Sequence, residues 1–190
     1  SSLKPTYGRI PLAGTISGPV PRIREPDLAV AGPLARNVDD LRLLYGILAD
    51  EPLATGAVRA GNLRIAVWLD ADVCPIDGGV RAVIAELCRA LRAAGAQLDE
   101  RARPAFNAEN YFRHFLQMVY GEMSAGFPES AYRAFRAAAR QGPQADWTPL
   151  IAMRDGVAQS HRDWLTALEE RELHRAAWAA FFTDYDALLA

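Results

Sequence analysis

The fold is decided by residues 63–100, which read LRIAVWLDADVCPIDGGVRAVIAELCRALRAAGAQLDE. The apolar run over residues 63–69 predicts a buried strand. A helix follows, with Asp77 as its N-cap and Gly95 at its end, and a short strand is expected near residues 97–100. The apolar face of this helix is predicted to comprise Val80, Ile84, Leu87, Cys88 and Leu91. Strand, helix and strand with short connections form a βαβ unit, which requires a parallel sheet, so the fold class is α/β.

The loop after the first strand argues against a nucleotide-binding half. Residues 70–79 carry Asp70, Asp72 and Asp77 where a pyrophosphate would need glycines and free backbone N–H groups. The three aspartates could instead be metal ligands, but their spacing lacks the EF-hand's ladder of ligands and its closing glutamate. A solvated loop with one helix cap is the better interpretation.

The segments before this unit read as a loop and a helix. Residues 1–33 are rich in glycine and proline, which predicts an extended run of loops. Asn37 then marks the start of a helix that continues to about residue 48 and stops before Pro52.

From residue 104 onward the composition becomes helical. Helices are expected near residues 107–125 and 129–141, and a long one from about Asp155 to Phe182. The apolar stripe of the long helix is predicted to comprise Leu165, Leu168, Leu173, Ala177 and Phe181. Residues 187–190 then begin a strand-like run.

Composition and charge exclude several classes of function. The 190 residues are 51% hydrophobic and carry a formal net charge of −2, which fits one globular domain or a large piece of one. Charges of both signs are spread without a basic block, so we expect neither nucleic acid nor an anionic membrane surface as a partner. No apolar run approaches membrane-spanning length and no signal pattern opens the chain, so a cytoplasmic location is the default expectation.

The residue types that commonly carry catalysis or metals form no recognisable constellation. Cys74 and Cys88 belong to no CxxC or Cys/His cluster, so a zinc site is not indicated. We expect Cys88 to be buried and Cys74 to lie in a loop. His114, His161 and His174 fall on expected helices without a recognisable serine or cysteine partner, which favours packing or surface roles for them.

Two short motifs resemble those of the amidase-signature family. Residues 3–9 read LKPTYGR and match the family's GLKPTxGR element, and residues 32–36 read GPLAR and match its GP(L/M)AR element. Residues 63–67, the Gly95-Ala96 step and residues 185–189 are similar to a later strand, a helix end and the "YDxLL" entry to a strand. The resemblance therefore spans nearly the whole chain.

The resemblance implies a division of the chain. Residues 1–190 would form a fragment of one amidase-signature domain, with its mixed sheet and flanking helices. Within it, residues 1–103 would supply a portion of the α/β core, residues 104–182 a variable helical cover and residues 183–190 the start of the next core strand.

The resemblance also implies a chemistry. In that family a serine, assisted by a second serine and a lysine, attacks an amide carbonyl, an amine or ammonia leaves, and water releases the acid. Those three residues and the oxyanion-hole amides lie upstream of the matched motifs, so no catalytic residue is expected within residues 1–190. Ser1 and Ser2 are not remnants of that signature, because the family has glycine where Ser2 stands and no GGSSG surrounds them. No cofactor or metal is implied.

The helical segment resembles the region that covers the family's active-site entrance. Candidate residues for lining a substrate pocket there are Tyr111, Phe115, Met118 and Tyr120, with packing of the helix as the competing role for at least half of them. Trp147, Trp164 and Trp178 could also line an apolar pocket, although packing between helices is the commoner role.

Two classes of function remain open. The first is a segment of an amide hydrolase whose parent acts on a small-molecule amide. The second is a noncatalytic α/β domain for binding or assembly that shares the fold, including a pseudoenzyme. Under either, a parallel sheet with uncovered edges and faces predicts homo-oligomerisation or marginal stability of the isolated chain.

Overall fold

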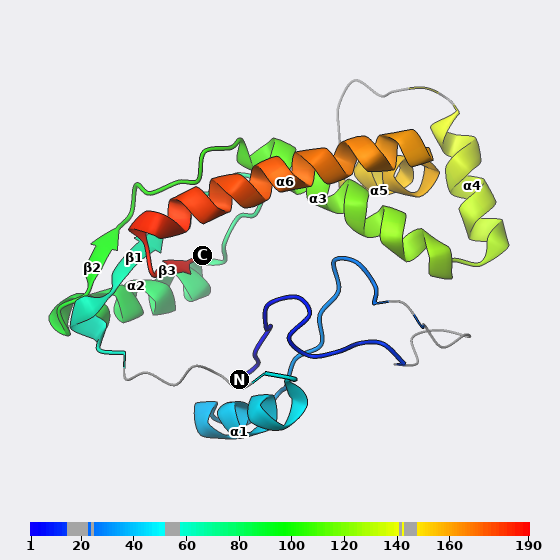
Figure 1. Cartoon of the computed structure of the whole chain (residues 1–190). Coiled ribbons are helices and arrows are strands. Elements are labelled where there is room, and N and C mark those ends of the chain that lie inside the picture. The colour runs from blue at the N-terminus through cyan, green and yellow to red at the C-terminus, as the bar shows by residue number, and fades with distance from the viewer. Residues whose placement is uncertain (15–22, 24, 52–57, 141, 143–147) are drawn as a thin grey trace.

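The computed structural model describes residues 1–190 except 15–22, 24, 52–57, 141 and 143–147. Its helices and strands are α1 (Val38–Leu48), β1 (Arg64–Val67), α2 (Gly78–Ala93), β2 (Gln97–Asp99), α3 (Ala108–Met123), α4 (Glu129–Ala139), α5 (Pro149–Ala158), α6 (His161–Asp184) and β3 (Ala187–Leu189). Short 3₁₀ turns lie at Ala60–Asn62 and Ser124–Gly126. In Figure 1 the sheet and α2 lie at one end, α3, α4 and α5 gather towards the other, and α6 runs between the two.

The sheet is parallel, as the βαβ pattern predicts. Its strand order is β2-β1-β3, with Ile65 opposite Leu98 on one side and Ala187 on the other. Ile65, Ala66 and Val67 of the central strand are buried. The strand-like residues near the C-terminus thus complete the sheet described here, and the α/β fold class is confirmed.

Arg64 and Asp186 fix the start of β3 against β1. The backbone N–H of Arg64 donates to Asp186 Oδ2 at 2.8 Å, and the N–H of Asp186 donates to the Arg64 carbonyl at 2.8 Å. Arg64 Nη2 also lies 3.2 Å from Asp186 Oδ1. The hydrogen bond between the side chains lowers the pKa of Asp186 and raises that of Arg64.

The helical half meets the sheet through the C-terminal end of α6. Phe181 packs with Ala66 and Ala102 in a buried cluster, and Trp178, Tyr185 and Leu188 lie against it. The Phe181 ring is 4.9 Å from that of Tyr185 and 5.6 Å from that of Trp178. This aromatic packing holds the long helix over the sheet.

Helix α5 packs closely against α3. A β-carbon at Gly156 would lie 2.3 Å from the Gln117 carbonyl oxygen, so only glycine allows the two backbones to approach this far. Beside it, the buried Arg154 pairs with Asp155, Nη2 to Oδ1, at 2.6 Å.

The prediction of one long helix from Asp155 to Phe182 is wrong. Helix α5 ends at Ala158, and α6 begins at His161. Ser160 and Asp163 form a capping box that starts the new helix, and their hydrogen bond lowers the pKa of Asp163. Two sequence signals mark the start of α5: Thr148 is its N-cap, and Pro149 lies in its first turn.

The predicted apolar stripe of α6 also needs correction. Of its five predicted members, Phe181 is buried and Leu168 and Ala177 are partly buried, as predicted, but Leu165 and Leu173 are 49% and 72% exposed. The inward face instead includes His174 and Trp178, which are partly buried. Aromatic and imidazole rings replace leucines on this face because α6 crosses α3 at a ring-rich contact.

Helix α2 has the predicted ends but a narrower buried face. Asp77 accepts a hydrogen bond from the Gly79 N–H at 2.7 Å, and Gly95 has a φ of 93°. Cys88 is buried and Cys74 is exposed, as expected. Val80 and Leu87, predicted on the apolar face, are exposed, because no described segment covers that part of the helix.

The remaining boundaries agree closely with the expected elements. Described residues before α1 form no helix and no named strand, as their glycine and proline content predicts.

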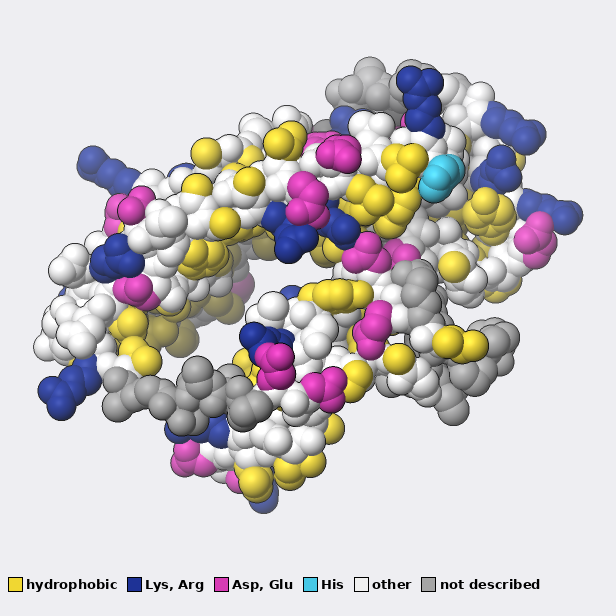
Figure 2. All heavy atoms as spheres, viewed as in Figure 1, with side chains coloured by type: hydrophobic (Ala, Val, Ile, Leu, Met, Phe, Trp, Pro, Cys, Tyr) yellow, Lys and Arg dark blue, Asp and Glu magenta, His cyan; other side chains and the backbone are white. Residues whose placement is uncertain are grey.

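No helix among the described residues combines the length and apolar character needed to cross a membrane. Figure 2 shows cationic and anionic side chains interspersed over the visible face.

Candidate functional site

The two motifs near the N-terminus lie side by side. The Leu3 N–H donates to the Pro33 carbonyl at 3.1 Å, and the Ala35 N–H donates to the Ser1 carbonyl at 2.9 Å. Ser2 and Leu34 form an antiparallel bridge between these contacts. Residues some thirty positions apart therefore form one short paired ribbon.

Gly32 makes this pairing possible. A β-carbon there would lie 1.9 Å from the Leu3 carbonyl oxygen and 2.9 Å from Pro5 Cδ. Pro5 and Pro33 are buried beside it. The glycine of the GPLAR motif is thus required by the close approach of the LKPTYGR motif.

An open hollow of about 590 Å³ lies beside the paired motifs and the start of α1. Its lining residues are Ser1, Leu34, Ala35, Arg36, Asp40, Leu43 and Leu44. Asn37 caps α1 by accepting a hydrogen bond from the Asp40 N–H at 2.8 Å, which fixes how the helix leaves the GPLAR motif. The hollow carries one guanidinium, of Arg36, and one carboxylate, of Asp40, which accepts a hydrogen bond from Asn37 Nδ2 at 3.0 Å.

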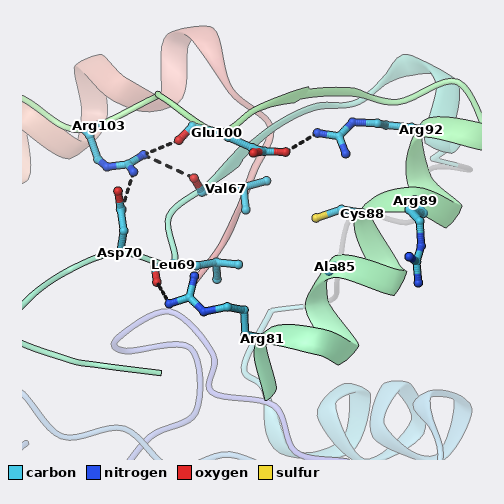
Figure 3. A pocket seen from close by; sticks show the side chains of 10 residues that line it. All are labelled: Val67, Leu69, Asp70, Arg81, Ala85, Cys88, Arg89, Arg92, Glu100 and Arg103. Atoms are coloured by element: carbon cyan, nitrogen blue, oxygen red, sulfur yellow. Dashed lines mark hydrogen bonds and ion pairs between the residues drawn. The ribbon is translucent and has the colours of Figure 1, made fainter. Parts of the chain in front are cut away.

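A second hollow, of about 390 Å³, lies between α2 and the end of β1 (Figure 3). It lies where ligands commonly bind in α/β sheets, outside the carboxyl end of a strand. Its lining residues are Val67, Leu69, Asp70, Arg81, Ala85, Cys88, Arg89, Arg92, Glu100 and Arg103. Figure 3 shows the Cys88 sulfur pointing towards the space between α2 and β1.

The arginines of this hollow are already engaged within the chain. Arg103 pairs with Asp70 and donates to the Val67 carbonyl at 3.3 Å, and Arg81 donates to the Leu69 carbonyl at 2.7 Å. Arg92 pairs with Glu100 at 2.5 Å. These bonds tie the loops around β1 to α2, so the hollow is built by structural ion pairs.

The aspartates of the loop after β1 do not act together. Asp70 pairs with Arg103, and Asp77 caps α2. Among the described residues, the group of acidic, histidine or cysteine side chains that could hold a metal lies elsewhere. The interpretation of a solvated loop with one helix cap agrees with this arrangement.

The four residues predicted to line a substrate pocket have different environments on α3. The Tyr111 ring stacks on Phe106 with centroids 4.6 Å apart. Met118 is 1% exposed, Phe115 is 42% exposed, and Tyr120 is partly buried. Neither of the two hollows described above is lined by any of these side chains.

The tryptophans considered as pocket-lining candidates also have different environments. Trp164 lines a small hollow of about 180 Å³ with His161, Ser160 and Gln159 among its neighbours. Trp178 packs in the aromatic cluster above the sheet. Trp147 lies outside the described residues.

The histidines reveal a cluster that sequence reasoning missed. His114 on α3 is buried. It lies close to Glu170 and His174 of α6: one ring nitrogen of each histidine and a carboxylate oxygen of Glu170 are within 4.8 Å of one another. His114 and His174 are sixty positions apart, so no local pattern joins them. The available signal was the spacing of Glu170 and His174, four residues apart on one helix face.

The family comparison identifies the class of protein: the chain belongs to the Amidase family, whose sequence model matches residues 3–190. The resemblance seen in the two motifs is thereby confirmed.

Curated relatives point to the same class. The chain is 24% identical over 205 residues to an indoleacetamide hydrolase of Bradyrhizobium japonicum, covering 100% of this chain and 41% of the relative. It is 25% identical over 201 residues to an indoleacetamide hydrolase of Bradyrhizobium diazoefficiens, covering 100% of this chain and 36% of the relative. The chain thus spans less than half the length of these relatives. No solved structure matches the chain at a significant level.

Proposed function

We propose that residues 1–190 are part of a hydrolase that cleaves the C–N bond of a small-molecule carboxamide through a serine acyl-enzyme. The observation that carries this proposal is the pairing of the LKPTYGR and GPLAR motifs. Two backbone hydrogen bonds hold them together, from the Leu3 N–H to the Pro33 carbonyl and from the Ala35 N–H to the Ser1 carbonyl. The family match over residues 3–190 supports it. No cofactor is needed for this chemistry, because serine, base and oxyanion hole suffice.

We propose that the described residues contribute binding surface and not the acyl-transfer machinery. Such machinery needs a nucleophile within hydrogen-bond reach of a base, and oxyanion donors beside it. Cys88, the buried thiol, lies among guanidiniums already paired with carboxylates and carbonyls. We therefore propose that the serine, second serine and lysine come from outside residues 1–190, and that the 190 residues alone are inactive.

The substrate we propose is a primary amide that carries an aromatic group. The two curated relatives are named as hydrolases of indoleacetamide, which is such a molecule. The helical segment carries the exposed Phe115 and the partly buried Tyr120, aromatic side chains that could contact an indole ring. Its position as a cover over the active-site entrance, implied by the family resemblance, would give it control of substrate choice.

The test is ammonia release from indole-3-acetamide, phenylacetamide and acetamide, measured for the full-length polypeptide and for residues 1–190 alone. We expect serine-dependent turnover by the full-length polypeptide, fastest with the aromatic amides, and none by the shorter chain. Turnover by residues 1–190 alone would refute the assignment of catalysis to other residues. A full-length polypeptide with no turnover of any amide would favour the noncatalytic binding or assembly domain.

A further inference from the structure

The cluster of His114, Glu170 and His174 lies where α3 crosses α6, away from both the paired motifs and the hollow at β1. His114 Nε2 is 4.0 Å from Glu170 Oε2, and the two imidazole rings have centroids 5.1 Å apart. The three residues come from two helices that the fold holds together. The amide-hydrolysis proposal uses none of them.

Helix geometry brings these side chains close together. Glu170 and His174 are four residues apart on α6, so they lie one above the other on the same face. His114 faces them from α3, and its ring is positioned by a hydrogen bond of 2.9 Å between Nε2 and the Ala167 carbonyl. Because a carbonyl only accepts, Nε2 carries the ring proton in this arrangement.

One ring nitrogen of His174 is not satisfied within the described part of the chain. Its Nδ1 is buried there without a hydrogen-bond partner. Buried polar atoms are normally paired, and the exceptions call for an explanation such as a ligand position. Phe106 and Tyr111 pack edge-on against the ring, with centroids 5.5 and 5.0 Å away, so the ring lies against an apolar wall.

Charged groups beside the two imidazoles include Glu170 of the cluster itself and Arg171, the next residue in the sequence. Burial, followed by the nearby His114, lowers the pKa of His174, while Glu170 opposes that shift. The neighbouring cation, Arg171, is directed to Asp27, with Nη1 and Oδ2 2.7 Å apart.

We propose that His114, Glu170 and His174 form a binding site for a divalent cation of the zinc type. Two imidazole nitrogens and one carboxylate oxygen are a donor set that zinc uses, with water at the fourth position. In a tetrahedral zinc site the ligand atoms lie about 3.3 Å apart, given bonds of about 2.0–2.1 Å. The ligand atoms now lie within 4.8 Å of one another, so binding requires small rotations of the side chains, of which that of Glu170 is 48% exposed.

Binding at His114 Nε2 requires the ring to turn away from the Ala167 carbonyl, so the hydrogen bond is lost, and the ring proton moves to Nδ1. The cation would then join α3 to α6 directly. It would stabilise the folded chain by an amount that rises with the logarithm of its affinity, because a ligand that binds only the folded state raises stability by mass action.

The experiment is a titration of the full-length polypeptide with Co²⁺, followed by visible absorption, and with Zn²⁺, followed by thermal melting. The background carries Cys74→Ser, which removes the exposed thiol as a competing ligand. We expect one cobalt per chain with the bands of a low-coordinate site, displacement by Zn²⁺ and a higher melting temperature with Zn²⁺. Glu170→Gln and His174→Gln should each weaken binding at least 10- to 100-fold, the range known for loss of outer ligand partners.

Two matched variants serve as controls. Glu169→Gln changes an exposed glutamate one position away on α6, and His161→Gln changes an exposed histidine at the start of α6. Both should bind cobalt as the parent does. The proposal is overturned if cobalt gives no bands, or if Glu170→Gln, which removes a half-exposed carboxylate and leaves the fold intact by circular dichroism, binds as tightly as Glu169→Gln. Loss of binding in both glutamate variants would also overturn it, since the effect would then be one of general charge.

Discussion

Gly32 is the single residue on which the contact between the two family motifs depends. An added β-carbon would meet the Leu3 carbonyl oxygen at 1.9 Å and Pro5 Cδ at 2.9 Å. Those atoms belong to the backbone and to a proline ring, which cannot move aside as the end of a flexible side chain can. We expect Gly32→Ala to lower the free energy of unfolding by about 1–3 kcal/mol, the usual cost of overpacking. Urea-induced unfolding measures this change.

Gly46 provides the control for that prediction. It lies in α1, and a β-carbon added there would have no atom within 4 Å, so Gly46→Ala meets no clash. Alanine in a helix interior should stabilise the chain by about 0.5–1 kcal/mol relative to glycine. Equal stabilities for Gly32→Ala and the parent would contradict the close approach of the two motifs.

Between elements, Tyr185 connects the two outer strands of the sheet. Its hydroxyl donates to Asp99 Oδ2 at 2.6 Å, from the residues before β3 to the last residue of β2. This hydrogen bond is the main reason why the pKa of Asp99 is lowered and the pKa of Tyr185 is raised. A hydrogen bond from the Arg101 N–H also lowers the pKa of Asp99. The pair therefore makes the stability of the sheet depend on pH in both the acidic and the alkaline range.

The signs of the two effects differ. The Asp99 contribution is present above its ordinary pKa of 3.8 and is lost as the pH falls through the depressed value. The Tyr185 contribution is present below its ordinary pKa of 10.0 and is lost as the pH rises through the elevated value. We expect Tyr185→Phe to be less stable than the parent near neutral pH, with a smaller loss of stability at both extremes.

Unfolding in urea across the pH range checks this expectation. Tyr7→Phe, at a tyrosine that is 49% exposed, is the matched control and should follow the parent's profile. A Tyr185→Phe profile parallel to that of the parent at every pH would show that the hydroxyl bond does not contribute.

At the scale of the whole molecule, exposed apolar side chains are the feature that bears on self-association. Leu43 and Ile47 of α1 are 65% and 70% exposed, and Val83 and Leu87 of α2 are 66% and 43% exposed. Figure 2 shows hydrophobic side chains at the surface over α1. Contiguous apolar surface of this kind drives association. We expect residues 1–190, prepared alone, to associate as concentration rises.

Sedimentation velocity over a range of concentrations tests this prediction. The double substitution Val83→Lys with Leu87→Gln changes one exposed face of α2 and should shift the distribution towards the monomer without lowering helix content. A parent chain that stays monomeric at every concentration, with a sharp melting transition, would refute the prediction.

Local patterns predicted the elements whose signals are local. The strand at β1, the cap at Asp77 and the helix end at Gly95 each depend on a few neighbouring residues, and each was predicted. The break between α5 and α6 was missed although Ser160 and Asp163 signal it, because the helical composition on both sides outweighed a two-residue interruption. The exposure of Leu165 and Leu173 could not be predicted, since it depends on which face of α6 meets α3.

The sequence by itself determined the α/β class, the βαβ unit and the amidase motifs, because each of these depends on the periodicity and spacing of residues close together in the chain. Only the tertiary structure decided that Leu3 pairs with Pro33 across a glycine, that Tyr185 reaches Asp99, and that His114 meets Glu170 and His174. Those contacts join residues far apart in the chain. Their formation depends on how strands register and how helices cross, which side-chain packing settles only when the whole chain has folded.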